Sequence, residues 1–192
     1  MAIIRADHKD HFDKRIKKII FSAAQINEKI EELAHWVNEN YKDSKDLVLV
    51  GLLKGSLPFL AALIKHINVD HEIDFIVASS YFGKTKSSGN IKIVMDLNLD
   101  IKNKDVLIIE DIIDSGITLD KIYKNLSARN PKSLKLMTLL DKPYKRKVDL
   151  KVDIFGFCAP DEFLVGFGLD VNEKLRNLPY IGVFDKKYLS EV

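Results

Sequence analysis

The sequence has few of the features that indicate disulfide bonds, a membrane-spanning segment or a nucleic-acid partner. Its single cysteine, Cys158, excludes an intrachain disulfide and a cysteine-cluster metal site. The longest apolar runs are interrupted by charged residues well before about 18 positions, so no transmembrane helix is predicted. The 30 Lys and Arg residues against 28 Asp and Glu leave a formal charge of +2, too small a bias to indicate a nucleic-acid or membrane partner. The N-terminal stretch is unlike a signal peptide, and we expect a soluble cytoplasmic protein.

The length of 192 residues favours a single domain over residues 1–192. A chain of this size can bury roughly 70% of its unfolded surface, which is enough for one good core. We find no internal repeat, linker or low-complexity tract that would divide it.

The order of the predicted elements indicates an α/β fold. Residues 22–25 have capping-box spacing, and the apolar residues that follow fall on one helical face. Residues 46–53 are typical of a buried strand, followed by a turn and a helix with Ser56 as N-cap. Two β-rich runs on either side of residues 83–90 predict a hairpin with a long polar loop. Strands alternating with helices favour a central, mostly parallel sheet flanked by helices.

The last third of the sequence is rich in short strand-like runs broken by proline and glycine. This pattern predicts a small C-terminal hood beside the sheet, formed mainly by residues 155–192 together with the N-terminal arm.

The segment "VLIIEDIIDSGITL", residues 106–119, carries the most chemistry. It is typical of a central strand that ends in a tight turn before a helix. In open α/β sheets ligands bind beyond the carboxyl ends of the strands, where Glu110, Asp111 and Asp114 are expected. The backbone N–H groups of residues 115–118 could hold a phosphate. An ordinary helix cap by Asp114 or Ser115 is the plainer alternative, but a cap needs one acceptor and leaves the other carboxylates for a ribose diol or a cation.

A second turn, "GLLKGS" at residues 51–56, offers N–H groups and the Lys54 ammonium ahead of a helix, which suits a second anion. Its glycine could equally serve only to close the turn. The sequence "GKT" at 83–85 imitates the end of a Walker A motif, but the first glycine of that motif would fall at Ala78. We therefore exclude a P-loop nucleoside triphosphatase.

Other candidate residues lie near the expected strand ends of the C-terminal third. Lys142 in "LLDKPYKRK" is the member of a basic segment best placed to point inward, whereas residues 145–147 are expected to form a solvated surface turn. The segment "DEFLVGFGLDVNEKLR" contains Phe163, Asp170 and Arg176. By default Phe163 would be a core or flap aromatic and Asp170 a turn residue, and the three become candidates because they occur together.

These motifs together resemble a known family. The segment "EDIIDSGITL" is similar to the phosphoribosyl diphosphate signature of the type I phosphoribosyltransferases. The segments "LLKGS", "SSYFGKTKSSG", "LLDKP" and "PDEFLVGFGLDVNEKLRNLPYIGV" occur in the order and spacing of the hypoxanthine-guanine branch of that family. The resemblance covers nearly the whole chain after residue 12 and implies the type I phosphoribosyltransferase fold with a flexible lid hairpin.

The resemblance implies a reaction that joins hypoxanthine or guanine to phosphoribosyl diphosphate, with Asp114 as general base and Mg²⁺ as cofactor. It implies metal binding by Asp170, Glu110 and Asp111, a cis peptide between Leu53 and Lys54, and a homodimer or homotetramer. The residues implied to contact substrate are Lys54, Gly55, Ser80, Tyr81, Glu110, Asp111, Asp114, Ser115, Gly116, Ile117, Thr118, Lys142, Phe163, Leu164 and Arg176.

Within that set the resemblance assigns separate roles. Glu110 and Asp111 would hold the ribose hydroxyls, residues 114–118 the 5′-phosphate, and Lys54, Gly55 and Arg176 the pyrophosphate. Lys142 would select 6-oxopurines because an ammonium group only donates hydrogen bonds, and Phe163 would stack on the base. Ser56 and Ile117 stand where many relatives have glycine and some have lysine, respectively.

Two other classes of function stay open at this point. A regulator could use the same fold to sense phosphoribosyl diphosphate and bind RNA through residues 145–147. A receiver-like signalling domain would hold Mg²⁺ in an acidic cluster, but its acidic residues come from separate strands, unlike Glu110, Asp111 and Asp114. A lid-like loop at 79–89 and Lys142 favour the enzyme.

Overall fold

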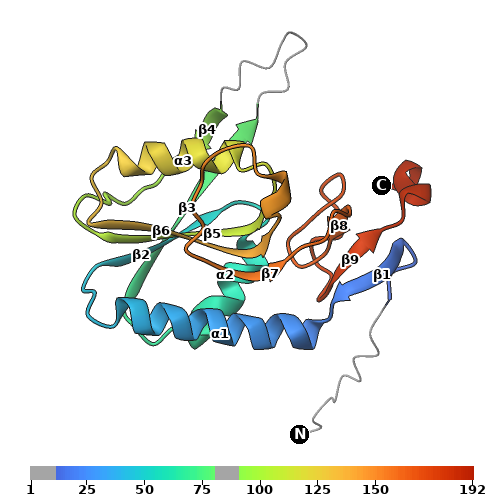
Figure 1. Ribbon diagram of the computed structural model, residues 1–192, viewed down its shortest axis with the longest axis horizontal. Coiled ribbons are helices and arrows are strands. Elements are labelled where there is room, and N and C mark those ends of the chain that lie inside the picture. Colours follow the sequence, from blue (N-terminus) through green and yellow to red (C-terminus); the bar gives the residue numbers. More distant parts are fainter. Residues whose placement is uncertain (1–11, 81–90) are drawn as a thin grey trace, which may run out of the picture.

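The computed structural model describes residues 12–80 and 91–192, without the side chains of residues 79, 80 and 91. Its larger sheet has six strands (Figure 1). In spatial order they are β4 (Ile91–Met95), β3 (His71–Ser80), β2 (Leu47–Leu52), β5 (Asp105–Ile113), β6 (Ser133–Asp141) and β7 (Ile154–Cys158). All neighbours pair in parallel except β3 with β4, which confirms the predicted mostly parallel α/β sheet. The predicted lid loop, including Tyr81, lies outside the described residues.

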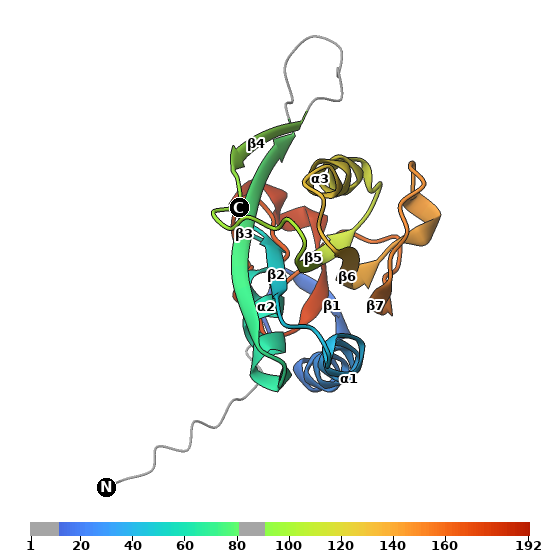
Figure 2. The same ribbon diagram turned by 90° about the vertical axis from the view of Figure 1, so that its left-hand side faces the viewer.

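Helices cover both faces of this sheet (Figure 2). Helices α1 (Ala23–Tyr41) and α2 (Leu57–Leu63) pack on one face, and α3 (Ile117–Ser127) packs on the other. Successive strand residues point to opposite faces, so a strand covered on both sides must be apolar throughout. In β2, Leu47 and Leu49 join the α1 side of the core, while Val48 and Val50 join the α3 side.

The predicted start of α1 is confirmed. The Ser22 hydroxyl accepts a hydrogen bond from the Gln25 backbone N–H, and the Gln25 side chain accepts one from the Ser22 backbone N–H. Apolar residues at helical spacing form its buried face: Ile26, Ile30, Leu33, Ala34, Val37 and Tyr41. Ser56 is the N-cap residue of α2, as predicted, but its buried hydroxyl donates to the Leu52 carbonyl at 2.6 Å and makes no capping hydrogen bond.

A second, three-stranded antiparallel sheet lies beside the first (Figure 1). It joins β1 (Ile16–Phe21), β9 (Ile181–Phe184) and β8 (Leu164–Val165), and we refer to this sheet and the loop 166–178 as the hood. The hood therefore combines sequence from both ends of the chain. The expected boundary at residue 155 falls inside β7, which belongs to the larger sheet.

Short 3₁₀ turns complete the described chain at Ile64–His66, Pro143–Lys145 and Lys186–Glu191. In the described residues no helix has the length and apolar character needed to cross a membrane.

Candidate active site

The turn between β5 and α3, residues 114–118, is built around a glycine. Gly116 has φ of 76°, in the left-handed region that favours a residue without a Cβ atom. It is also the N-cap residue of α3, which has no side-chain cap. Neither Asp114 nor Ser115 is therefore the N-cap residue, although the Ser115 hydroxyl accepts a long hydrogen bond from the Ile117 N–H at 3.5 Å, and the Asp114 carboxylate is not used to cap the helix.

A cavity of about 190 Å³ opens over this turn. Five of the predicted substrate residues line it together with apolar neighbours from β5 and α3: Glu110, Ile112, Ile113, Asp114, Ser115, Gly116, Thr118 and Leu119. Ile117 does not line the cavity, and its side chain is exposed. The N-terminus of α3, with its positive dipole end, borders this space, which suits an anion such as a phosphate.

The adjacent carboxylates Glu110 and Asp111 lie in different surroundings because neighbouring strand residues alternate in direction. Glu110 lines the cavity. Burial first, and the Asp111 carboxylate second, raise the pKa of Glu110 well above its usual value. Asp111 is buried against Gly55 instead, and its Oδ1 accepts a hydrogen bond from the Ile112 backbone N–H at 2.9 Å.

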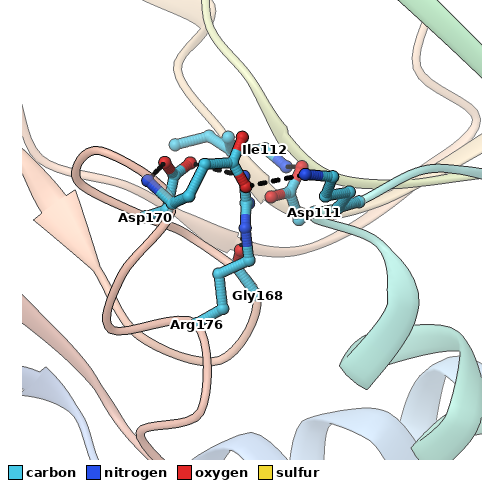
Figure 3. Close-up of polar contacts among 7 residues, drawn as sticks. Asp111, Ile112, Gly168, Asp170 and Arg176 are labelled. Carbon is cyan, nitrogen blue, oxygen red and sulfur yellow. Dashed lines mark hydrogen bonds and ion pairs between the residues drawn. The ribbon is translucent and has the colours of Figure 1, made fainter.

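Two glycines, Gly55 and Gly168, let three parts of the chain meet beside Asp111. Figure 3 shows Gly168 and Asp111 at this junction. A Cβ atom at Gly55 would lie 1.9 Å from the Asp111 Oδ2 atom. A Cβ atom at Gly168 in the hood would lie 2.0 Å from the Gly55 carbonyl oxygen. The turn after β2, the end of β5 and the hood are thus in close contact. The peptide between Leu53 and Lys54 in this turn is cis, as the resemblance implied.

Charged side chains of the hood face Lys54 across this junction. Glu173 Oε2 lies 3.0 Å from Lys54 Nζ and 3.2 Å from Arg176 Nη2. Arg176 Nη2 also lies 3.0 Å from Asp170 Oδ1. Hydrogen bonds from Lys54 first and Arg176 second lower the pKa of Glu173, and the positive charges of the two side chains act in the same direction. The two cations predicted to hold pyrophosphate therefore share one carboxylate.

Arg176 is also fixed by the backbone. Its Nη1 donates to the Gly168 carbonyl at 2.7 Å, close to the Gly55–Gly168 contact (Figure 3). Among the residues that the structure describes, its buried Nε has no hydrogen-bond partner. A buried donor without a partner is costly, so this side chain has capacity for a further acceptor.

A third group lies around Lys142, just beyond β6. The residue is only 4% exposed, and its ammonium donates to the Glu162 carbonyl at 3.0 Å. Burial lowers the pKa of Lys142, although the Asp114 carboxylate acts in the opposite direction. The next residue after Glu162, Phe163, is half-exposed and meets Phe184 edge to face at 5.9 Å. Leu164 is buried in β8.

The donor set fits Mg²⁺ held jointly with a substrate. Within residues 12–80 and 91–192, no three His, Cys, Asp or Glu side chains gather as a metal site. Mg²⁺ is usually bound through one or two carboxylates together with substrate phosphates and waters. Asp111 and Asp170 at the hood junction could supply such carboxylates (Figure 3).

Two functional candidates were missed by sequence reasoning. No sequence pattern predicted a role for Glu173, because a single glutamate in a loop is typical of a solvated surface residue. Arg146 was expected on a solvated surface turn, and this is wrong. Its side chain is 13% exposed, pairs with Asp141 and donates to the Asp114 carbonyl at 3.2 Å. Ser80 ends β3, and its side chain is not among those described.

The fold and the glycine turn at the end of β5 define a class of protein, and comparison agrees: the chain belongs to the phosphoribosyl transferase domain family, whose model matches residues 18–172. Among curated proteins, the hypoxanthine phosphoribosyltransferase of Escherichia coli (strain K12) is 50% identical over 170 residues, covering 88% of this chain and 96% of the relative. The hypoxanthine-guanine phosphoribosyltransferase of Bacillus subtilis (strain 168) is 50% identical over 168 residues, covering 88% and 93%.

Solved structures give the same result. A hypoxanthine phosphoribosyltransferase from Staphylococcus aureus is 44% identical, with a TM-score of 0.86, and the match covers 90% of this chain and 94% of that one. A hypoxanthine-guanine phosphoribosyltransferase from Bacillus anthracis is 45% identical, with a TM-score of 0.84, and the match covers 88% and 99%. The resemblance seen in the sequence and the type I phosphoribosyltransferase fold are confirmed.

Proposed function

We propose that the protein is a purine-salvage enzyme that transfers the phosphoribosyl group of phosphoribosyl diphosphate to hypoxanthine or guanine. The products are IMP or GMP and pyrophosphate. One observation carries this proposal: the buried Lys142 ammonium and the half-exposed Phe163 lie in one group, and the turn with its acidic residues follows the adjacent strand. A donor-only cation beside an aromatic face suits a 6-oxopurine, and the turn suits a sugar phosphate.

In this reaction an imidazole nitrogen of the base forms a bond to the anomeric carbon while the carbon–pyrophosphate bond breaks. The proton leaves the base for the Asp114 carboxylate, which acts as general base. Positive charge develops on the sugar, and a nearby carboxylate such as Glu110 stabilises it. Lys54 and Arg176 bind the departing pyrophosphate, and Lys142 donates to the 6-oxo group of the base.

Magnesium is the cofactor that this chemistry requires, and Asp170 and Asp111 are the residues proposed to hold it. Bound there, the ion would neutralise charge on the pyrophosphate leaving group. We further propose a cytoplasmic homodimer or homotetramer without a nucleic-acid partner.

A spectrophotometric assay tests the proposal. The protein is mixed with phosphoribosyl diphosphate and Mg²⁺, and each of hypoxanthine, guanine, xanthine and adenine is supplied in turn. Rapid conversion of hypoxanthine or guanine, with little conversion of adenine, is expected. Binding of phosphoribosyl diphosphate without turnover of any purine would instead favour a regulator that senses this metabolite.

A further inference from the structure

The segment after β6, residues 142–147, runs along the outer side of the β5–α3 turn and holds three successive carbonyl groups of the chain. The Lys142 N–H donates to the Ile113 carbonyl at 3.0 Å, and the Lys147 N–H donates to the Ser115 carbonyl at 2.9 Å. Between these two backbone bonds, Arg146 Nη1 donates to the Asp114 carbonyl at 3.2 Å. Only this middle contact depends on a side chain.

Holding a carbonyl group also orients the amide on the far side of the same peptide. In a planar trans peptide the C=O and the following N–H point in opposite directions. The three contacts therefore turn the N–H groups of Asp114, Ser115 and Gly116 away from residues 142–147. The cavity is lined by the turn and by none of residues 142–147, so we expect these amides to face the proposed phosphate position.

Arg146 is itself held in place. Its Nη2 pairs with Asp141, and the two side chains are 13% and 8% exposed. Asp141 lies beside the start of the turn because Ile113 and Asp141 are paired in the β5–β6 register. A Cβ atom at Gly116 would lie 2.9 Å from Arg146 Cδ, so the turn fits closely against the arginine. A planar guanidinium can bond a carboxylate and a carbonyl at once, which a lysine ammonium matches poorly.

We propose that Arg146, oriented by Asp141, is a positioning residue for the 5′-phosphate of the sugar substrate. It holds the Asp114 carbonyl so that the amides of the turn are aimed at the phosphate before it binds. Arg146 does not contact the substrate itself. The inference rests on the proposed function, since it assumes that a ribose 5-phosphate group occupies the cavity.

The test measures two ligands separately by calorimetry, ribose 5-phosphate and Mg-pyrophosphate, on wild type and Arg146→Ala. Loss of a hydrogen bond from a charged donor changes affinity by about 10- to 100-fold. Arg146→Ala is expected to lose that much affinity for ribose 5-phosphate and to keep its affinity for Mg-pyrophosphate, which binds at the hood. Unchanged ribose 5-phosphate affinity would overturn the proposal, and so would equal losses for both ligands, because equal losses indicate general damage to the fold.

Two controls keep the result interpretable. Arg129→Ala removes an arginine that pairs with Asp96 away from the site, and it should leave both affinities unchanged. Arg146→Lys keeps the charge and is the variant to use if Arg146→Ala does not fold; it should show an intermediate loss of affinity for ribose 5-phosphate alone.

Added guanidinium ion should restore part of the affinity of Arg146→Ala for ribose 5-phosphate. Failure of wild type to bind ribose 5-phosphate would count against the proposed function instead.

Discussion

The two sides of the site are held in place by different kinds of interaction. At the β5–α3 turn, backbone hydrogen bonds and the nearly buried Arg146–Asp141 pair fix the chain around the cavity. At the hood, Lys54 and Glu173 form an ion pair in which both side chains are more than 60% exposed. Exposed ion pairs contribute little and exchange partners readily, whereas a turn held by its own backbone is oriented in advance. The comparison suggests a preformed site for the retained phosphate and a rearranging site for the pyrophosphate that leaves.

The largest effect is expected on the preformed side, from Asp114→Asn. Turnover should fall by roughly 10² to 10⁴, because the proposed general base is lost, while phosphoribosyl diphosphate binding stays largely intact. Steady-state kinetics combined with calorimetry measures both. Asp149→Asn, at an exposed position away from the cavity, is the matched control. Normal turnover in Asp114→Asn would remove that residue from its role.

A second variant, Gly55→Ala, tests the close contact between the turn after β2 and the end of β5. The added methyl group would meet the Asp111 carboxylate, and overpacking of this kind costs about 1–3 kcal/mol. The free energy of unfolding should fall by that amount in denaturant titrations, together with pyrophosphate affinity. Gly51→Ala meets only the side chains of Leu60 and Phe75, which can shift, so its loss should be smaller. Equal losses in the two variants would contradict the close contact at Gly55.

Lys142→Ala should lower kcat/KM for hypoxanthine and guanine by about 10- to 100-fold, as expected for loss of a charged donor. It should not create strong adenine activity, because removing a donor supplies no acceptor for the 6-amino group. Parallel assays with the three bases measure this. Unchanged kcat/KM for hypoxanthine and guanine would show that Lys142 does not contribute to base selection.

The pH dependence of activity with 6-oxopurines also tests the role of Lys142. Burial lowers the pKa of Lys142, so its ammonium is present below that lowered pKa and is lost as pH rises through it. Use of 6-oxopurines should therefore decline at a pH below the usual lysine value of about 10.4. Lys142→Arg stays charged and should move this decline to higher pH. An alkaline limb that does not move would assign the decline to another group.

The smallest effect is expected on the rearranging side, from Glu173→Gln. Removing the carboxylate frees Lys54 and Arg176 for pyrophosphate, but exposed pairs contribute only about 0.2–1 kcal/mol. Pyrophosphate should therefore bind about 1.5- to 5-fold more tightly in calorimetry. Glu191→Gln, which breaks the exposed pair with Lys14, should change nothing. Weaker pyrophosphate binding in Glu173→Gln would mean that the Glu173 carboxylate promotes pyrophosphate binding and does not compete with pyrophosphate for Lys54 and Arg176.

Local patterns in the chain were enough to predict several parts of this protein. Apolar periodicity fixed the buried face of α1, the capping box fixed its start, and the apolar run before Glu110 placed the site at the end of a central strand. These features depend on residues a few positions apart, so a pattern in the chain is enough to predict them. The family motifs added the residue roles that spacing alone could not supply.

Only the tertiary structure decided which of these parts meet. It joined β1 to β9 in the hood, turned Asp111 against Gly55, and brought Glu173 to Lys54 and Arg146 to the Asp114 carbonyl. Such contacts join residues far apart in the sequence, and a lone arginine or glutamate in a loop has no local pattern that distinguishes a solvated charge from a paired one. The physical reason is that pairing and burial depend on the neighbours that folding supplies.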